Sequence, residues 1–229
     1  MVPALLADLR RPWLWKGSGT ASVLVLGLLG TLLVAANLEP TTGGPSPEGP
    51  FREAGLSLML TGAGVMGSCS FTADFRAGCL TRRVLLFQRV PAFIARALTT
   101  VLAALLSGVI VGAAFGLSGA LFPEGWQASP QVVLAFAGMA AMGSVWGFAI
   151  GSFIRSHLVS LFAVPLSLVV PQVLPLGNAG AYLFPFQAAD WANQAAVHIP
   201  PSGSFSGALA WLLIVLGAAC DVFSKRDLA

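Results

Sequence analysis

Few residues of this chain can do chemistry, because only 9% of its 229 residues are charged. Neither Lys16 nor Lys225 follows the glycine-rich loop that cradles phosphates in nucleotide hydrolases. The sequence has no HExxH pair and no histidine cluster for a metal. Asp190 and Asp221 lie at the margins of apolar runs, whereas ionisable groups that mark ion or proton pathways lie within them. These patterns disfavour a hydrolase, a metalloenzyme and a proton- or sodium-coupled transporter.

Ser118 is the best candidate for a nucleophile. Gly116-Leu117-Ser118-Gly119 resembles the GxSG motif of rhomboid-like intramembrane serine proteases, and His198 is expected on the same side of the membrane. A serine nucleophile needs a base within hydrogen-bond reach. Ser118 lies near the end of an apolar run and His198 lies in a loop followed by two prolines. We therefore interpret the motif as a helix end rich in small residues, and a protease using Ser118 is a remote alternative.

The composition of the chain indicates the kind of structure in which these residues lie. Hydrophobic residues make up 56% of the chain, and its mean hydropathy is +0.84. Soluble domains carry roughly a quarter charged residues, which keep them dispersed in water. The sequence therefore predicts an integral membrane protein. Continuous rather than alternating hydrophobicity favours helices over a β-barrel.

Six uncharged runs of at least twenty residues lie between the charged positions. A helix needs about 20 apolar residues to cross a bilayer. We expect a single all-α domain over residues 1–229, with six transmembrane helices. The predicted spans are residues 18–36, 54–72, 97–121, 132–153, 158–176 and 205–222.

The basic residues predict the orientation of these spans. If six spans alternate, eleven of the twelve basic residues fall on one side, and only Arg52 falls on the other. Basic loops face the cytoplasm, so both termini are expected there. The sequence pI of about 9.1 is thereby explained as a topology signal, and no nucleic acid partner is inferred.

Three further segments have patterns of their own. Residues 3–15 are amphipathic and predict an N-terminal helix at the inner membrane surface. Residues 74–96 carry five arginines among apolar residues, which predicts a separate interfacial helix before the third span. Residues 178–204 hold one formal charge, Asp190, and several aromatic residues, which predicts an outer re-entrant or interfacial element. Its aromatic side chains Phe184, Phe186 and Trp191 are the candidates for an outer gate.

Glycines at four-residue spacing mark the third and fourth spans. A helix face without side chains lets another backbone approach closely. We expect these glycines to serve tight packing within the bundle, with a specific dimer contact as the alternative. They are Gly108, Gly112 and Gly116 in the third span and Gly143, Gly147 and Gly151 in the fourth.

Three segments together resemble the membrane subunits of bacterial ABC-2 type exporters. Residues 74–79, Asp-Phe-Arg-Ala-Gly-Cys, are similar to that family's Glu-Phe/Tyr-x-x-Gly-Thr segment, with Asp74 and Cys79 in place of the usual Glu and Thr. Residues 151–156 resemble its Gly-x-x-x-Arg-Ser at the end of the fourth span. Residues 223–228 resemble its Phe-x-Arg-Arg-Asp ending. The motifs follow in the family's order along the full length of the chain.

The resemblance implies a permease in the bacterial cytoplasmic membrane that binds no cofactor itself. Two separate ATPase subunits, which bind ATP and magnesium, would supply the energy, and a second permease, identical or paralogous, would complete the pathway. The cytoplasmic helix would be a coupling helix that docks in an ATPase. The docking candidates are Asp74, Phe75, Arg76, Gly78, Arg82 and Arg83.

This interpretation also leads to expectations about mutants and about the substrate. Because Asp74 and Arg76 are predicted outside the spans, replacing them by alanine is expected to spare membrane insertion and impair docking. An uncharged pathway favours an amphipathic or hydrophobic substrate such as a drug, a peptide antibiotic or a lipid. The alternative function is a channel-type or other non-transport membrane subunit, which would not bind an ATPase.

Overall fold

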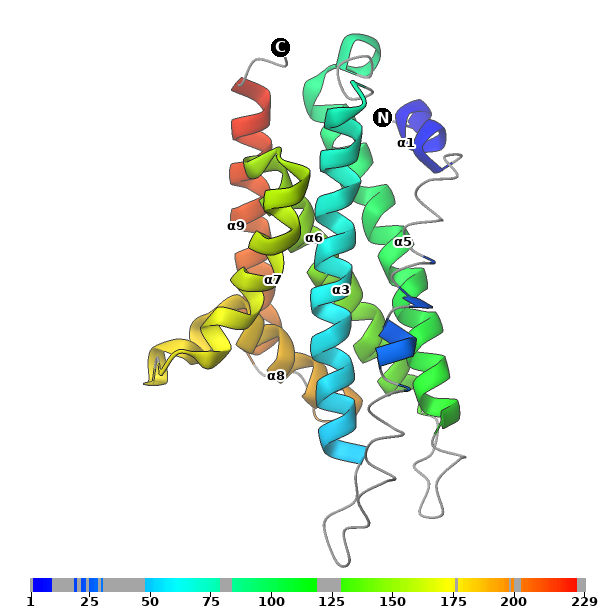
Figure 1. The fold of residues 1–229 in the computed structure, drawn as a ribbon, viewed down its shortest axis with the longest axis vertical. Helices are drawn as coiled ribbons and strands as arrows, with labels where there is room; N and C mark the ends of the chain where they lie inside the picture. Colours follow the sequence, from blue (N-terminus) through cyan, green and yellow to red (C-terminus); the bar gives the residue numbers. More distant parts are fainter. Residues whose placement is uncertain are drawn as a thin grey trace, which may run out of the picture.

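The computed structural model describes residues 2–9, short pieces between residues 19 and 30, and residues 48–78, 84–118, 129–175, 177–197, 199 and 203–225. The regular structure in these ranges is helical, and they contain no strand. The longest helices run side by side along the long axis of the molecule (Figure 1).

Four of the described helices are long and apolar enough to cross a membrane. The chain is thus a helical membrane protein. The six-span count stays a prediction, because predicted span 18–36 lies largely outside the described residues. The four long helices are α3 (Glu48–Arg76), α5 (Arg89–Ser118), α6 (Pro130–Ile154) and α9 (Ser204–Lys225).

The predicted fifth span corresponds to a shorter helix, α7 (His157–Val173). Its 17 residues extend about 26 Å at 1.5 Å per residue, less than a hydrocarbon core of about 30 Å. Pro165 and Pro171 lie inside this helix, which ends two residues after the second proline. The residue after the helix, Leu174, is extended with ψ of 138° and precedes Pro175, and a residue before a proline is disfavoured in the helical conformation.

Helix α6 is the centre of the bundle and contacts α3, α5, α7, α8 and α9. It begins at a serine–proline start: the Ser129 hydroxyl accepts a hydrogen bond from the backbone of Gln131 at 3.3 Å, and Pro130 occupies the first turn. It ends at Arg155, which adopts a left-handed conformation with φ of 57°. The two-residue connection that follows folds α7 back along α6.

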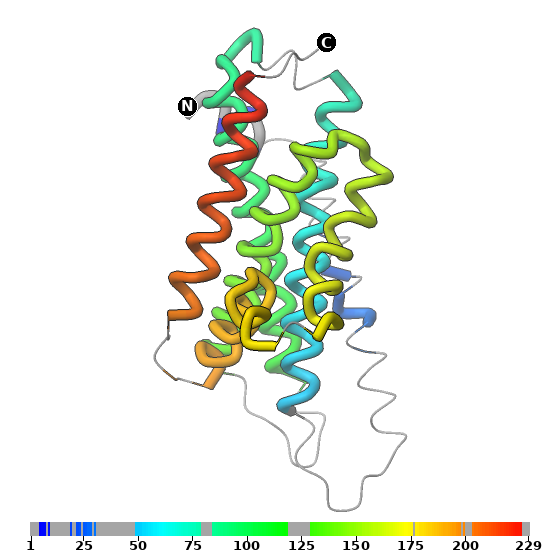
Figure 2. Tube along the Cα trace, turned by 90° about the vertical axis from the view of Figure 1, so that its left-hand side faces the viewer, coloured from blue at the N-terminus to red at the C-terminus, as the bar shows by residue number. Residues whose placement is uncertain are grey.

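The two ends of the bundle hold different elements. At one end α3 finishes, α5 begins, α1 (Val2–Leu9) contacts α5, and α9 ends; we call this the Asp74 end (Figure 1). At the opposite end, the α8 end, η2 (Gly177–Tyr182) and α8 (Phe184–Ala196) connect α7 to α9. Helix α8 lies across this end and contacts α3, α6, α7 and α9 (Figure 2).

The prediction of a separate interfacial helix over residues 74–96 is wrong for the described part of that range. Asp74 belongs to the last turn of α3, and Arg96 lies two turns inside α5. Between the two helices, residues 84–87 form a single helical turn, and Gln88 with φ of 67° separates it from α5. The prediction ended a span at each charged residue. In the structure, Asp74 and Arg96 neutralise each other inside the bundle, so α3 and α5 include these charged residues.

Apolar side chains remain exposed along the outer faces of α5, α7 and α9. Examples are Leu117 at 71%, Phe162 at 69% and Ile214 at 65% exposure. Such faces are unfavourable in water but match the acyl chains of a bilayer. The composition of these surfaces agrees with the membrane assignment.

Candidate functional site

Asp74 and Arg96 form a buried ion pair between the end of α3 and the beginning of α5. The Arg96 Nε atom lies 3.4 Å from Asp74 Oδ2, and the two side chains are 1% and 9% exposed. Arg96 also donates a hydrogen bond of 3.0 Å to the carbonyl oxygen of Ser70. A buried charge needs such partners, because an isolated ion loses its hydration without compensation. The pair ties the two helices together at the Asp74 end.

Hydroxyl groups surround this ion pair. Ser70 Oγ and Thr100 Oγ1 lie 2.6 Å apart, and Thr100 also donates to the Arg96 carbonyl at 2.9 Å. Two residues further along α3, Thr72 Oγ1 lies 2.9 Å from His157 Nδ1 at the start of α7. These bonds connect α3 with both α5 and α7 at one level of the bundle.

Four phenylalanines from four helices pack next to the ion pair. Phe71 of α3 and Phe93 of α5 each lie edge-on to Phe148 of α6, with ring centroids 5.4 Å and 5.1 Å away. Phe223 of α9 lies 5.2 Å from Phe93. All four are at most 2% exposed. Edge-to-face contacts of this kind add to the stabilisation from burial alone, so the aromatic cluster fixes α9 to the bundle.

The turn between α6 and α7 joins the same end. The Arg155 guanidinium lies above the ring of Phe75, 4.9 Å from its centroid, a cation–π contact. Arg89 at the start of α5 donates a hydrogen bond of 2.9 Å to the Ser224 carbonyl near the end of α9. The structure therefore brings together segments 74–76, 151–156 and 223–225, which lie far apart in the sequence.

The predicted docking residues differ in their accessibility. Asp74 lies in the last turn of α3 and is only 6% exposed, so the expectation that it is a surface charge outside the spans is wrong. Its partner Arg96, which sequence reasoning missed, neutralises it inside the bundle. Arg76 and Gly78 are exposed, and Phe75 is half-buried under Arg155. Arg82 and Arg83 lie outside the described residues.

The glycines in α6 lie where its backbone meets that of α3. A Cβ atom at Gly143 or Gly147 would overlap the carbonyl oxygen of Leu60 or Gly64, and one at Gly151 would lie 2.9 Å from the Ser68 Cα atom. Both helices thus approach at four-residue intervals. These contacts lie within one chain.

The glycines in α5 approach α6 in the same way. A Cβ atom at Gly108 would lie 2.6 Å from the Ala137 Cα atom, and one at Gly112 would lie 2.9 Å from that of Val133. Gly116 is also buried. Helix α6 therefore has a close glycine contact with each of its two main neighbours.

At the α8 end, the three predicted gate aromatics occupy different positions. Phe184 is 1% exposed and stacks on Trp146 of α6, with centroids 4.5 Å apart and an angle of 11° between the rings. Trp191 packs over Gly138 of α6. Phe186 is half-buried and borders a cavity. The first two attach α8 to α6, and only Phe186 faces open space of the kind that a gate would close.

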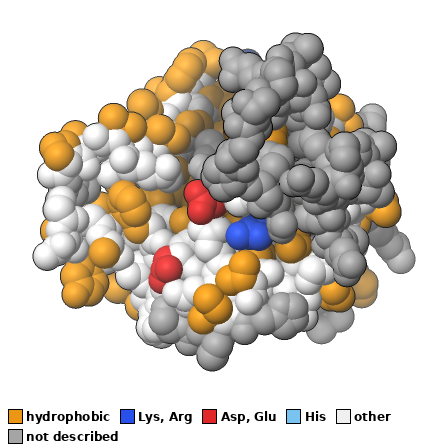
Figure 3. Space-filling model, turned by 90° about the horizontal axis from the view of Figure 1, so that it is seen from below, with side chains coloured by type: hydrophobic (Ala, Val, Ile, Leu, Met, Phe, Trp, Pro, Cys, Tyr) orange, Lys and Arg blue, Asp and Glu red, His pale blue; other side chains and the backbone are white. Residues whose placement is uncertain are grey.

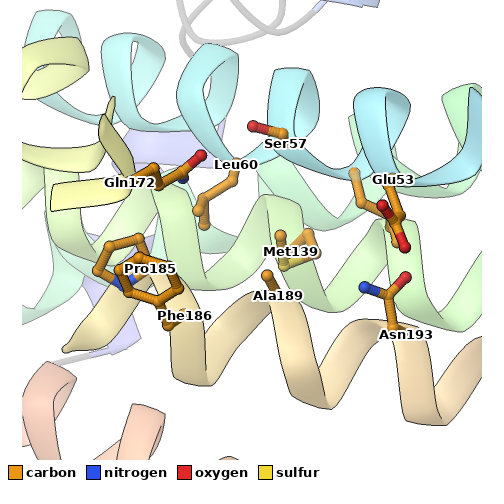
Figure 4. Close-up of a pocket in the computed structure, with 10 residues that line it drawn as sticks. Glu53, Ser57, Leu60, Met139, Gln172, Pro185, Phe186, Ala189 and Asn193 are labelled. Atoms are coloured by element: carbon orange, nitrogen blue, oxygen red, sulfur yellow. The ribbon is translucent and has the colours of Figure 1, made fainter. Parts of the chain in front are cut away.

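This cavity has a volume of about 330 Å³ and lies between α3, α6, α7 and α8 (Figure 4). Sequence reasoning did not identify it, because its lining combines residues from four helices that no sequence motif links. The lining residues are Glu53, Leu56, Ser57, Leu60, Met139, Gln172, Pro185, Phe186, Ala189 and Asn193.

The residues considered for catalysis are not brought into a reactive arrangement in the described part of the chain. Ser118 Oγ donates a hydrogen bond of 2.7 Å to the Phe115 carbonyl of its own helix. His198, its proposed base, lies outside the described residues. Within the described ranges, no group of three His, Cys, Asp or Glu residues could hold a metal ion.

Comparisons of this chain with protein-family models, with curated proteins and with solved structures give no match. Any assignment of function must therefore come from the residues and their arrangement.

Proposed function

We propose that this chain is the membrane permease of an ABC-2 type exporter in the bacterial cytoplasmic membrane. Both termini are cytoplasmic in this proposal, and the Asp74 end faces the cytoplasm. Two separate ATPase subunits bind ATP and magnesium there, and a second permease copy, identical or paralogous, completes the pathway. The chain itself hydrolyses nothing, and its substrate is amphipathic or hydrophobic.

One observation carries this proposal. The three segments that carry the resemblance to the exporter family meet at one end of the bundle, through the Arg155–Phe75 contact and the aromatic cluster with Phe223. A functional surface assembled from distant segments requires such a meeting, whereas three chance resemblances do not. The helices long enough to cross a membrane agree with a permease.

The geometry changes the role of Asp74 within the proposal. Its side chain is buried against Arg96 and so is not available to a partner. We assign the direct contact to exposed residues beside it: Arg76, Gly78 and the apolar pair Leu85 and Leu86, which are 82% and 75% exposed. The Asp74–Arg96 pair then transmits a push on this surface to α3 and α5.

Purification of the tagged chain from its native membrane tests the proposal. We expect it to retain an ATPase subunit and vanadate-sensitive ATP hydrolysis, and to have neither when the chain is produced alone. Leu86→Glu and Arg76→Ala should reduce the yield of ATPase. If Arg76 contributes a desolvated interfacial ion pair, its loss costs about 2–5 kcal/mol, some thirty-fold or more in affinity.

Lys225→Ala is the matched control, because Lys225 is an exposed cation at the same end. It should retain the ATPase at wild-type yield. ATP turnover by the pure chain would exclude a permease without its own hydrolase. Wild-type ATPase yield in both Arg76→Ala and Leu86→Glu would exclude docking through this surface.

A further inference from the structure

The cavity at the α8 end has the size and lining of a ligand site. Its volume of about 330 Å³ lies at the lower end of the range of about 300–1,000 Å³ for small-molecule pockets. Each of four helices contributes to it: Glu53 from α3, Met139 from α6, Gln172 from α7 and Asn193 from α8. Such a cavity changes shape whenever these helices move relative to one another.

Two oxygen acceptors in this cavity lack a donor among the residues that the structure describes. The Asn193 Oδ1 atom is buried and has no hydrogen-bond partner within the described part of the chain. A buried acceptor without a donor has lost its hydrogen bonds to water without replacement, so the site calls for a donor. The Glu53 carboxylate forms no ion pair with any described residue. Figure 4 shows the side chains of Glu53 and Asn193 pointing toward one another across the cavity.

We infer that this cavity binds the protonated amine of a cationic amphiphile. An ammonium group has three donors and a positive charge, so it satisfies both the carboxylate and the amide oxygen at once. A neutral alcohol supplies one donor and no charge. An anion would be repelled by Glu53, and the chain's neighbouring cation, Arg52, does not line the cavity.

The remaining wall suits the apolar part of such a ligand. Leu60, Met139 and Phe186 line the cavity beside the polar residues. Methionine and aromatic side chains adapt to hydrocarbon surfaces of varied shape. On the described part of this face, acidic side chains lie among apolar and uncharged ones (Figure 3).

This inference adds a ligand class to the proposed function. It rests on that function only where it treats the ligand as the transported substrate. If the α8 end faces outward, the cavity is where a cationic amphiphile is held before release. The binding itself needs no ATPase. Failure of the binding experiment and failure of the exporter proposal are therefore distinguishable.

Protection of an engineered cysteine tests the inference. In a chain whose three cysteines, Cys69, Cys79 and Cys220, are replaced by alanine, Ala189→Cys places a thiol in the lining of the cavity. The rate of its modification by methyl methanethiosulfonate is measured in lipid nanodiscs at pH 7. The probes are octylamine and octanol, which share a chain length and differ in the charged donor.

Octylamine at about ten times its Kd should slow the modification about ten-fold, because the fraction of unoccupied sites falls as 1/(1 + [L]/Kd). Octanol should leave the rate nearly unchanged. Glu53→Gln should abolish the protection, and Asn193→Leu should weaken it. Asp190→Asn is the matched control, because Asp190 is an exposed carboxylate on α8 that does not line this cavity, and it should retain full protection.

Two results would overturn the inference. Equal protection by octylamine and octanol would show that only an apolar chain is recognised. Undiminished protection by octylamine in Glu53→Gln would show that the carboxylate does not hold the amine. Glu53 is exposed, so its replacement by an isosteric amide should not disturb folding and should leave the result interpretable.

Discussion

The polar side chains at the two ends of this bundle have different surroundings. At the Asp74 end, the opposite charges of Asp74 and Arg96 are buried against each other, and Arg96 also donates a hydrogen bond to the Ser70 carbonyl. At the α8 end, Glu53 and Asn193 border an open cavity, and one buried acceptor has no partner among the described residues. Buried charges that neutralise each other specify a single packed arrangement, whereas a carboxylate that borders an open cavity leaves a place for a ligand. The comparison predicts that the Asp74 end maintains the fold and that the α8 end binds a ligand.

The contrast extends to how the helices are fastened. Helices α3, α5 and α9 and the turn between α6 and α7 meet at the Asp74 end through ion pair, ring and carbonyl contacts. Helix α8 is fastened by apolar and ring contacts instead: Phe184 stacks on Trp146 of α6, and Trp191 packs over Gly138 of α6 and lies 5.6 Å from Phe205 of α9.

The largest effect is expected from breaking the buried ion pair on one side. Arg96→Met leaves the Asp74 carboxylate buried without its counter-ion, which should destabilise the protein by about 3–5 kcal/mol. Asp74→Ala should be similarly harmful, in place of the sequence-based expectation that it spares the fold. The midpoint of thermal unfolding in detergent measures both.

The double variant Asp74→Leu with Arg96→Met is the control for this prediction. It removes both charges, so it should recover much of the lost stability. If Arg96→Met alone unfolded at the wild-type midpoint, the ion pair would not hold the two helices together, and the comparison of the two ends would lose its main support.

The next largest effect is expected where α6 meets α3. Gly147→Ala adds a methyl group that would overlap the Gly64 carbonyl oxygen, so the helices must separate. Overpacking of this kind destabilises by about 1–3 kcal/mol. Gly217→Ala on α9 is the matched control, since nothing lies within 4 Å of the added atom. It should be neutral or slightly stabilising, because alanine favours helix more than glycine does. Equal unfolding midpoints for the two variants would contradict this close approach.

Much of the helical architecture could be predicted because hydrophobicity is a property of each residue. The predicted spans 132–153 and 205–222 lie within one to three residues of the ends of α6 and α9. The glycines at four-residue spacing indicated close packing, because one helix face without side chains lets another backbone approach. These features need no knowledge of a partner.

The site could not be predicted in the same way, because it depends on pairs of residues. Arg96 was interpreted as a boundary charge, since a sequence does not show that Asp74 lies opposite it. The signal that could have found the pair is the presence of opposite charges at facing ends of adjacent spans. The cavity gave no such signal, because Glu53 and Asn193 are 140 positions apart and neither belongs to a motif.

A smaller effect is expected at the α8 end. Trp146→Phe keeps an aromatic ring against Phe184 but removes the hydrogen bond of 2.9 Å from Trp146 Nε1 to Ser167 Oγ. The loss should be about 0.5–1.5 kcal/mol. Trp146→Leu also removes the stacked ring and should lower the unfolding midpoint further. If both replacements had the same midpoint, the ring stack would contribute nothing to fastening α8.

The smallest effect is expected from an ion pair that lies at the Asp74 end but in solvent. Lys225 Nζ lies 2.8 Å from Asp221 Oδ1, a shorter distance than in the Asp74–Arg96 pair, yet the side chains are 73% and 57% exposed. Water screens this attraction, and both side chains lose rotamer freedom in forming it, so pairs of this type contribute about 0.3–0.5 kcal/mol. Lys225→Ala should therefore shift the unfolding midpoint far less than Arg96→Met, and added salt should reduce even that shift. If the two variants were equally destabilised, distance rather than burial would determine the strength of the ion pairs, and the Asp74 end would owe its rigidity to its surface charges.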